Sequence, residues 1–195
     1  MKKVINLLLF ICLNSLLYAD DDLLLQAKFL FNQGKYSASQ SILQRMHNAN
    51  LANAEIMYLN ARCSKELFMI DAVFLYKKLN IQFPHHNYKD KVAKDLAQIY
   101  YREQQYENAI SYFLMIQYPT HEELFKLAYC YFNIGFLEDA QLYFLKVMNA
   151  DSKFSSPAQY YYASISYEKG LYQSALENFK DLLNDEKFGK IVPII

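Results

Sequence analysis

The sequence predicts an all-α protein built from about five helix-turn-helix repeats. The 195 residues include only four glycines and four prolines, which favours long helices over many short strands joined by tight turns. Hydrophobic residues make up 53% of the chain and aromatic residues 16%, which is enough for a sizeable core and excludes a disordered chain. A pattern of small and large apolar residues also recurs at intervals of roughly 34 residues, the length of a two-helix repeat.

Each repeat pairs a small residue on a first helix with a small residue on a second helix, followed four positions later by a large apolar residue. The small residues let the two helix backbones approach closely, and the large residue lies one turn further along the same face. Ala97, Ala128 and Ala163 occupy the first-helix position in the last three repeats. The second-helix position is occupied in turn by Ser39, Ala72, Ala109, Ala140 and Ala175.

Glycine marks the connection between the two helices of a repeat. Gly34, Gly135 and Gly170 fall at one repeat position, where the first helix must end in a left-handed residue that glycine adopts without a steric penalty. Three of the chain's four glycines share this position, so chance alignment is an unattractive explanation. The second repeat departs from the pattern, because Asn60 stands in place of the alanine and Leu67 in place of the glycine.

This pattern resembles the tetratricopeptide repeat family, and the resemblance implies a right-handed α-solenoid. The repeats are expected over residues 20–52, 53–88, 89–120, 121–155 and 156–187, which leaves an apolar C-terminal tail over 188–195. Ile81-Gln82-Phe83-Pro84 and Ile116-Gln117-Tyr118-Pro119 close the second and third repeats, with a proline expected to stop each second helix. These endings resemble those of periplasmic tetratricopeptide proteins of the Tol–Pal and outer-membrane-protein assembly machineries.

The N-terminus has the three parts of a secretory signal peptide over residues 1–19. Met1-Lys2-Lys3 is followed by an apolar run over residues 4–17 and then by Tyr18-Ala19, which provides a small residue for cleavage. The apolar run is shorter than the roughly 20 residues of a membrane-spanning helix. We therefore expect a periplasmic mature chain that begins at Asp20 and has no integral membrane span. Anchoring by an uncleaved N-terminal segment is the alternative.

The sequence offers no motif for catalysis or for a bound metal. It has no Gly-x-Ser-x-Gly elbow, no phosphate-binding glycine loop, no His-Glu-x-x-His helix and no paired-cysteine zinc motif. The adjacent His85 and His86 are expected to lie in a loop without a metal. Cys63 and Cys130 map to first helices with a complete repeat between them, which is too far apart for a disulfide. We expect no enzymatic activity and no cofactor, and the net charge of zero argues against a nucleic-acid partner.

The resemblance implies that first-helix residues line a concave groove that binds a partner peptide or helix. Aromatic anchors with a few lysines and arginines among them are typical of such grooves. The alternative is that the aromatic residues only pack the first helices together. The family's charged clamp for chaperone C-termini is not matched, because Ala61 and Asp95 stand where it has polar amide and basic side chains. The expected groove residues are Lys28, Phe31, Met57, Lys65, Lys94, Gln98, Tyr101, Arg102, Phe125, Tyr129, Phe132, Tyr160 and Tyr167.

These observations predict an exported scaffold for protein–protein interaction, within a bacterial cell envelope. One alternative is a structural subunit of a larger envelope machine of the outer-membrane biogenesis, Tol–Pal, secretion or motility type. A weaker alternative is an accessory to a cell-wall enzyme. The C-terminal tail is expected either to fold back over Phe179, Leu182 and Leu183 or to contact a partner or a second copy of the chain.

Overall fold

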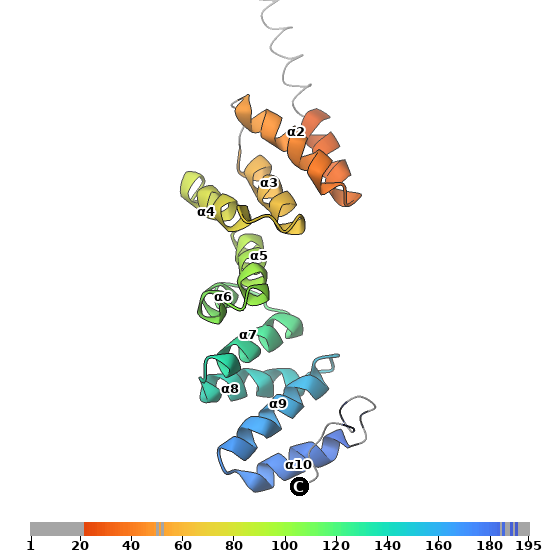
Figure 1. The fold of residues 1–195 in the computed structure, drawn as a ribbon, viewed down its shortest axis with the longest axis vertical. Coiled ribbons are helices and arrows are strands. Elements are labelled where there is room, and N and C mark those ends of the chain that lie inside the picture. Colours follow the sequence, from red (N-terminus) through yellow and green to blue (C-terminus); the bar gives the residue numbers. More distant parts are fainter. Residues whose placement is uncertain are drawn as a thin grey trace, which may run out of the picture. The chain divides into compact units, whose positions relative to one another are not determined.

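The computed structural model describes residues 22–49, 51, 53–183, 185, 188 and 190. Within these residues all regular structure is helical (Figure 1). A first helical segment covers residues 22–32. The helices that follow are α2 (Tyr36–Asn48), α3 (Ala54–Glu66), α4 (Ala72–Gln82), α5 (Lys89–Arg102), α6 (Tyr106–Phe113), α7 (His121–Asn133), α8 (Leu137–Met148), α9 (Ser155–Glu168) and α10 (Tyr172–Leu182). The expected signal peptide over residues 1–19 lies outside the described residues.

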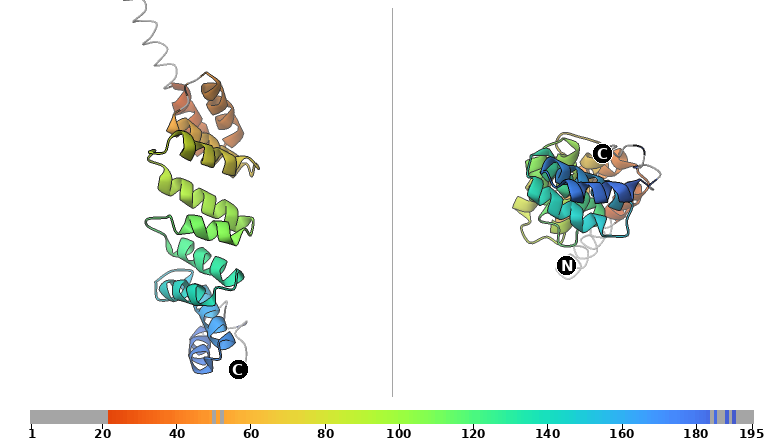
Figure 2. Two further views of the ribbon diagram at one scale, coloured as in Figure 1. Left: turned by 90° about the vertical axis from the view of Figure 1, so that its left-hand side faces the viewer. Right: turned by 90° about the horizontal axis from the view of Figure 1, so that it is seen from below.

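The chain forms two compact units, Met1–Asp95 and Leu96–Ile195, and the boundary between them falls within α5. In the first unit, α2 packs against α3, and α3 packs against α4. In the second unit, each helix from α6 to α10 packs against the next, and Figure 2 shows α7 to α10 following one another in this way. Helices that are neighbours in sequence are therefore neighbours in space within each unit, which is the pattern of a helical repeat protein.

The turns between first and second helices share one geometry. Gly34, Gly135 and Gly170 have φ angles of 73°, 80° and 75°, so the left-handed conformation predicted for them is confirmed. Phe68 and Gln104 adopt the same conformation with φ angles of 56° and 58°. In each of these turns the next residue donates its backbone N–H to the carbonyl five positions earlier, as from Phe136 to Tyr131 at 3.0 Å and from Met69 to Ser64 at 2.9 Å. This bond caps the carbonyl end of each first helix.

The second repeat carries the family pattern in a register one residue later than the sequence alignment placed it. The left-handed residue is Phe68 rather than Leu67, and the fully buried small residue on α3 is Ala61 rather than Asn60. The assignment of Asn60 and Leu67 is wrong because the connection is one residue shorter here. Buried Ala72 follows the left-handed residue by four positions, whereas the equivalent residue of the other repeats follows by five.

The small residues of the repeat are buried where paired helices pack together. Ala128 and Ala140 are fully buried in one core cluster with Phe144, which stands four residues after Ala140 as the pattern predicts. Ser39 is also fully buried. Its hydroxyl donates a 2.8 Å hydrogen bond to the backbone carbonyl of Ala27, so the polar group is satisfied without widening the helix contact.

The two Ile-Gln-aromatic-Pro segments differ in structure despite their similar sequences. Ile81 lies within α4 near its end and is largely exposed. Ile116 lies beyond the end of α6 and is buried, because the chain turns after Phe113, with the Ile116 N–H bonded to the Phe113 carbonyl at 3.2 Å. The expectation that a proline ends both second helices is therefore wrong for α6, which ends well before Pro119.

A buried carboxylate joins three helices of the first unit. Asp95 on α5 accepts hydrogen bonds from the phenols of Tyr76 at 2.9 Å and Tyr58 at 3.5 Å, and its other oxygen pairs with the Lys65 ammonium. Tyr58 and Lys65 belong to α3 and Tyr76 to α4. Because a buried charge is tolerated only when it is paired and hydrogen-bonded, this cluster fixes the arrangement of the three helices.

Cys63 and Cys130 are free and fully buried, as expected for small hydrophobic residues. Burial raises the pKa of both thiols, and it brings that of Cys130 to about 12. Among the described residues, no helix is long and apolar enough to cross a membrane.

One described residue of the C-terminal tail packs onto the last helix pair. Phe188 lies against the core cluster of Ala163, Ala175, Phe179 and Leu182, with its ring centroid 5.8 Å from that of Tyr160. At this residue the chain therefore folds back, which is one of the two expected outcomes. Most of the remaining tail lies outside the described residues.

Candidate functional site

The first unit contains an open cleft of about 240 Å³. Residues of the first helices line most of it, together with Tyr88, which comes directly before α5. This is the side of the repeat on which the sequence predicts a groove. The lining residues are Lys28, Phe31, Asn32, Glu55, Tyr58, Leu59, Arg62, Tyr88 and Lys91.

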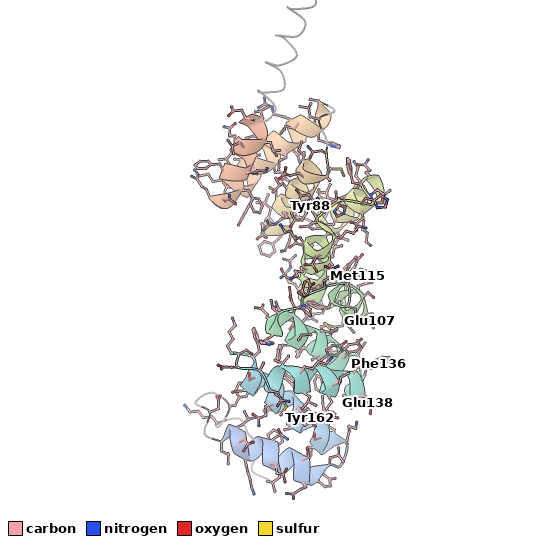
Figure 3. All side chains as sticks on the ribbon, turned by 180° about the vertical axis from the view of Figure 1, so that it is seen from behind. Tyr88, Glu107, Met115, Phe136, Glu138 and Tyr162 are labelled. Atoms are coloured by element: carbon pink, nitrogen blue, oxygen red, sulfur yellow. The ribbon has the colours of Figure 1, made fainter. Side chains whose placement is uncertain are left out.

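Stacked aromatic rings form the wall of the cleft. The Tyr58 and Tyr88 rings lie 4.5 Å apart between centroids with their planes at 13°, and Figure 3 labels Tyr88 beside the start of α5. The Arg62 guanidinium lies 4.5 Å from the Phe31 ring centroid and 5.8 Å from that of Tyr58. Arginine held over aromatic faces keeps its charge while its orientation is fixed.

His86 positions Tyr88 at this wall. The Tyr88 N–H donates to Nδ1 of His86 at 3.0 Å, and Nε2 of His86 lies 2.8 Å from Oδ1 of Asn80. Because Nδ1 accepts a hydrogen bond, the histidine is neutral and its proton is on Nε2, directed at Asn80. Burial and then the charge of Lys89 lower the pKa of His86, in agreement with this neutral form.

The cleft is cationic. Lys28, Arg62 and Lys91 line it, whereas Glu55 is the one carboxylate among the lining residues. Lys28 and Glu55 form a 2.7 Å ion pair. The Nε atom of Arg62 is buried and has no hydrogen-bond partner among the described residues. Glu55 is paired with Lys28, so the lining has no second carboxylate that could pair with Arg62 or Lys91.

The phenols of the cleft are neutral hydrogen-bonding groups. Burial raises the pKa of Tyr58, and the nearby Asp95 carboxylate raises it further. The pKa of Tyr88 is raised by burial and by Glu55. The cleft therefore offers aromatic surface, cationic hydrogen-bond donors and neutral hydroxyls, which is the chemistry of binding a carboxylate-bearing apolar segment.

The second unit has a continuous set of aromatic contacts on its first helices. The Tyr129 ring lies 6.0 Å from that of Tyr101 and 5.5 Å from that of Tyr161, in edge-to-face geometry. Phe125 and Phe132 also contact the Tyr161 ring, at 6.1 Å and 5.3 Å. These aromatic residues are half-buried, so they pack the first helices together and also present part of their rings to solvent.

The structure separates the predicted groove residues into distinct groups. Lys28 and Phe31 line the cleft of the first unit. Met57 is buried and faces a different hollow, beside His47 and Leu75, and Lys65 is held by Asp95, so neither belongs to the cleft. Lys94, Gln98 and Tyr160 are half-buried, while Arg102 and Tyr167 are exposed.

Sequence reasoning missed seven of the nine residues that line the cleft, among them Tyr58, Arg62 and Tyr88. It also missed Tyr161 of the aromatic set. Tyr58 and Arg62 follow Met57 and Ala61 by one residue, so the corrected register of the second repeat would have identified both. Tyr88 lies in a connection and Tyr161 beside the expected row. Neither position has a periodic signal that would have identified it.

The histidines do not form a metal site in the described part of the chain. His85 is exposed, whereas His86 is buried and bonded to Asn80 and Tyr88. No group of three or more histidine, cysteine, aspartate or glutamate side chains that could hold a metal ion occurs among the residues that the structure describes.

Solved structures of MamA share this fold. MamA of AMB-1 aligns with a TM-score of 0.69 at 18% identity, over 91% of this chain and 97% of that one. MamA of MSR-1 gives 0.65 at 18% identity, over 91% and 98% of the two chains. Residues 41 to the end of MamA from Desulfovibrio magneticus RS-1 give 0.67 at 14% identity, over 86% and 95%. No protein-family model and no curated protein matches the sequence.

These similarities concern the fold alone, because the sequence identities are low. MamA is a helical repeat protein, so the predicted fold class, a right-handed α-solenoid of about five tetratricopeptide-like repeats, is confirmed.

Proposed function

We propose that the protein is a protein-interaction module, and that the cleft of the first unit binds an acidic segment of a partner protein. The observation that carries this proposal is the charge of the cleft lining. The cations Lys28, Arg62 and Lys91 line it beside an aromatic wall, and Glu55 is the one carboxylate among the lining residues. The tetratricopeptide-type fold supports a role in binding rather than in catalysis.

The size of the cleft favours part of a peptide as the ligand. Its volume of about 240 Å³ is below the roughly 300–1,000 Å³ of pockets that enclose a small molecule. A peptide can place one aromatic or carboxylate side chain in such a space while its backbone runs along the surface. The partner side chain that fits best is an acidic one adjacent to an apolar one, because Arg62 and the Tyr58 ring are adjacent in the wall.

Binding of designed peptides tests this proposal. We expect peptides with alternating glutamate and tyrosine to bind, and peptides with lysine in place of glutamate not to bind, as measured by fluorescence anisotropy of labelled peptides. Arg62→Gln should weaken binding of the acidic peptide about tenfold, since a charge-assisted hydrogen bond contributes roughly 1.5–3 kcal/mol. Raising the salt concentration should weaken binding further.

Arg45→Gln provides the matched control, because Arg45 is an exposed arginine on α2 outside the cleft lining. It should leave peptide affinity unchanged. Equal affinity for the acidic and basic peptides, or equal losses from Arg62→Gln and Arg45→Gln, would show that the cleft does not select acidic segments.

We also propose that the protein is exported and acts in the periplasm of a bacterial envelope. The basis is the sequence of residues 1–22, with two lysines, an apolar run, Ala19 and three aspartates.

A further inference from the structure

The connection between α3 and α4 exposes four consecutive large apolar residues, which we term the apolar tip: Leu67, Phe68, Met69 and Ile70. Their exposed fractions are 36%, 73%, 42% and 101%. Ile70 is therefore as exposed as in an isolated peptide and projects from the unit. A contiguous group of exposed apolar residues of this kind is typical of a contact surface.

The backbone of the apolar tip is strained in a way that keeps Phe68 outside. Its φ angle is 56°, a conformation that is costly for a bulky residue with a Cβ atom. Gly34, Gly135 and Gly170 occupy the equivalent position in three other turns, so folding alone would be better served by glycine. Burial of the phenyl ring does not offset the backbone strain at Phe68, because most of the side chain is exposed to solvent. This indicates a role for Phe68 at the surface.

The outer face of α4 continues this surface. Phe74 and Ile81 are 64% and 79% exposed, and helical spacing places Lys77 and Lys78 between them. Lys77 is exposed, whereas Lys78 is half-buried at the edge of the hollow beside His47 and Leu75. The opposite face of α4 carries the buried Ala72, Tyr76 and Leu79. No aspartate or glutamate occurs within α4, and Asp71 is the one carboxylate at its N-terminal end.

We propose that the apolar tip and the outer face of α4 dock onto an anionic lipid membrane. Phe68 and Ile70 would enter the boundary between headgroups and acyl chains, and Lys77 and Lys78 would contact lipid phosphates. This surface is separate from the cleft, so it adds a second binding activity to the proposed function.

The chemistry of this surface favours lipid over a protein partner. The apolar tip contains no side chain with a hydrogen-bonding group, whereas protein contacts usually combine apolar anchors with hydrogen bonds. Large apolar residues interspersed with lysines, without carboxylates in the helix, are the composition of elements that lie in a membrane interface. The lysines complement an anionic lipid surface, although the chain as a whole has zero net charge.

A tryptophan reporter tests the proposal directly, because the sequence contains no tryptophan. Phe68→Trp is introduced into the chain from Asp20, so that the apolar run over residues 4–17 cannot itself enter a bilayer. We expect its fluorescence to shift to shorter wavelength on addition of phosphatidylcholine vesicles mixed with an equal amount of phosphatidylglycerol. Phe136→Trp is the matched control, since Phe136 is an exposed aromatic residue in the corresponding connection between α7 and α8 (Figure 3), and it should not shift.

Flotation with the same vesicles measures binding without a reporter. Phe68→Gly with Ile70→Ser should lower the vesicle-bound fraction at least about tenfold, since two large apolar side chains are removed from the bilayer contact. Glycine fits the backbone at position 68, so loss of binding cannot be attributed to unfolding, and a thermal melt checks this. Lys77→Gln with Lys78→Gln should weaken binding to the anionic vesicles, and pure phosphatidylcholine vesicles should bind less.

Three outcomes would overturn the proposal. The first is that the unsubstituted chain does not float with either kind of vesicle. The second is that the tip variant binds as well as the unsubstituted chain. The third is that light scattering shows a dimer which the tip variant converts to a monomer, because the apolar tip would then be covered by a second copy.

Discussion

The phenol of Tyr76 donates a 2.9 Å hydrogen bond to the carboxylate of Asp95, and both residues are buried. Tyr76 stands on α4 at the large apolar position of the repeat, and Asp95 stands on α5 at a position facing back to α3 and α4. Burial and the Asp95 charge raise the pKa of Tyr76, so the phenol is protonated at neutral pH and donates to the carboxylate.

Asp95→Ala should lower the free energy of unfolding by about 3–5 kcal/mol, because it leaves the Lys65 charge without its buried partner. Tyr76→Phe should cost only about 1–2 kcal/mol, since it removes one hydrogen bond. Chemical denaturation monitored by circular dichroism would measure both. Glu107→Ala, at an exposed position, serves as the control and should change the value by less than about 0.5 kcal/mol. Equal stability of Asp95→Ala and Glu107→Ala would contradict a structural role for the cluster.

Substitutions at the left-handed turn positions should act in opposite directions. Gly135→Ala meets no atom within 4 Å of the added Cβ, so its cost of about 1–2 kcal/mol arises from the φ angle alone. Phe68→Gly should leave stability unchanged or raise it by up to about 1 kcal/mol. Relief of the backbone strain stabilises the folded chain, and the greater freedom of glycine in the unfolded chain offsets part of this gain. Thermal melts of the two variants compare them. A marked destabilisation by Phe68→Gly would mean that the phenyl ring contributes to the core.

The stability of the first unit should fall as the pH drops below about 6.5, the ordinary pKa of histidine. The pKa of His86 is lowered in the folded chain, so the unfolded chain binds more protons in this range. Stability is therefore complete above the unfolded pKa and is lost as the pH falls through the folded pKa. Protonation would also place a hydrogen on Nδ1 against the Tyr88 N–H.

Denaturation at pH 7.5 and pH 5.5 measures this effect, and His86→Gln should reduce the difference between the two values. His85→Gln is the control, because His85 is the exposed neighbour. If both variants keep the pH dependence of the unsubstituted chain, His86 is not its source.

The mature protein is expected to begin at Asp20. The short apolar run and Ala19 favour cleavage, and the aspartates that follow suit the N-terminal end of the first helical segment, where exposed N–H groups favour negative charge. N-terminal sequencing of protein extracted from the cell envelope decides this point. Recovery of Met1-Lys2-Lys3 would instead favour the uncleaved anchor.

The repeat pattern was sufficient to predict the helix pairs and the left-handed turns. Apolar residues at helical spacing indicate a helix, and glycine at the end of a helix indicates a left-handed residue. It was insufficient for the register around Ala61, because the interval from Ser39 to Ala72 is short by one residue, which is less than the variation among the other intervals between second-helix small residues. The similar sequences that end at Pro84 and Pro119 led to a wrong prediction of where α6 ends. The point at which a helix ends depends on core packing, which four consecutive residues do not determine.

The candidate site was predicted only in part. The repeat alignment placed Lys28 and Phe31 on the first-helix side of the expected groove, and both line the cleft of the first unit. It could not identify Tyr88, which is positioned by a hydrogen bond to His86 in a connection. Nor could it anticipate that Lys65 is held by Asp95, because a contact between buried polar groups far apart in sequence has no periodic signal.

The burial of Cys63 and Cys130 lowers the chemical reactivity of their thiols. Burial raises the pKa of Cys130, so very little of this thiol is deprotonated at neutral pH. The thiolate is the form that reacts with oxidants and attacks disulfides. The polypeptide can therefore move from a reducing to an oxidising compartment with both of these sulfur atoms unchanged. Purified protein should keep the Cys63 and Cys130 thiols during storage in air without an added reductant.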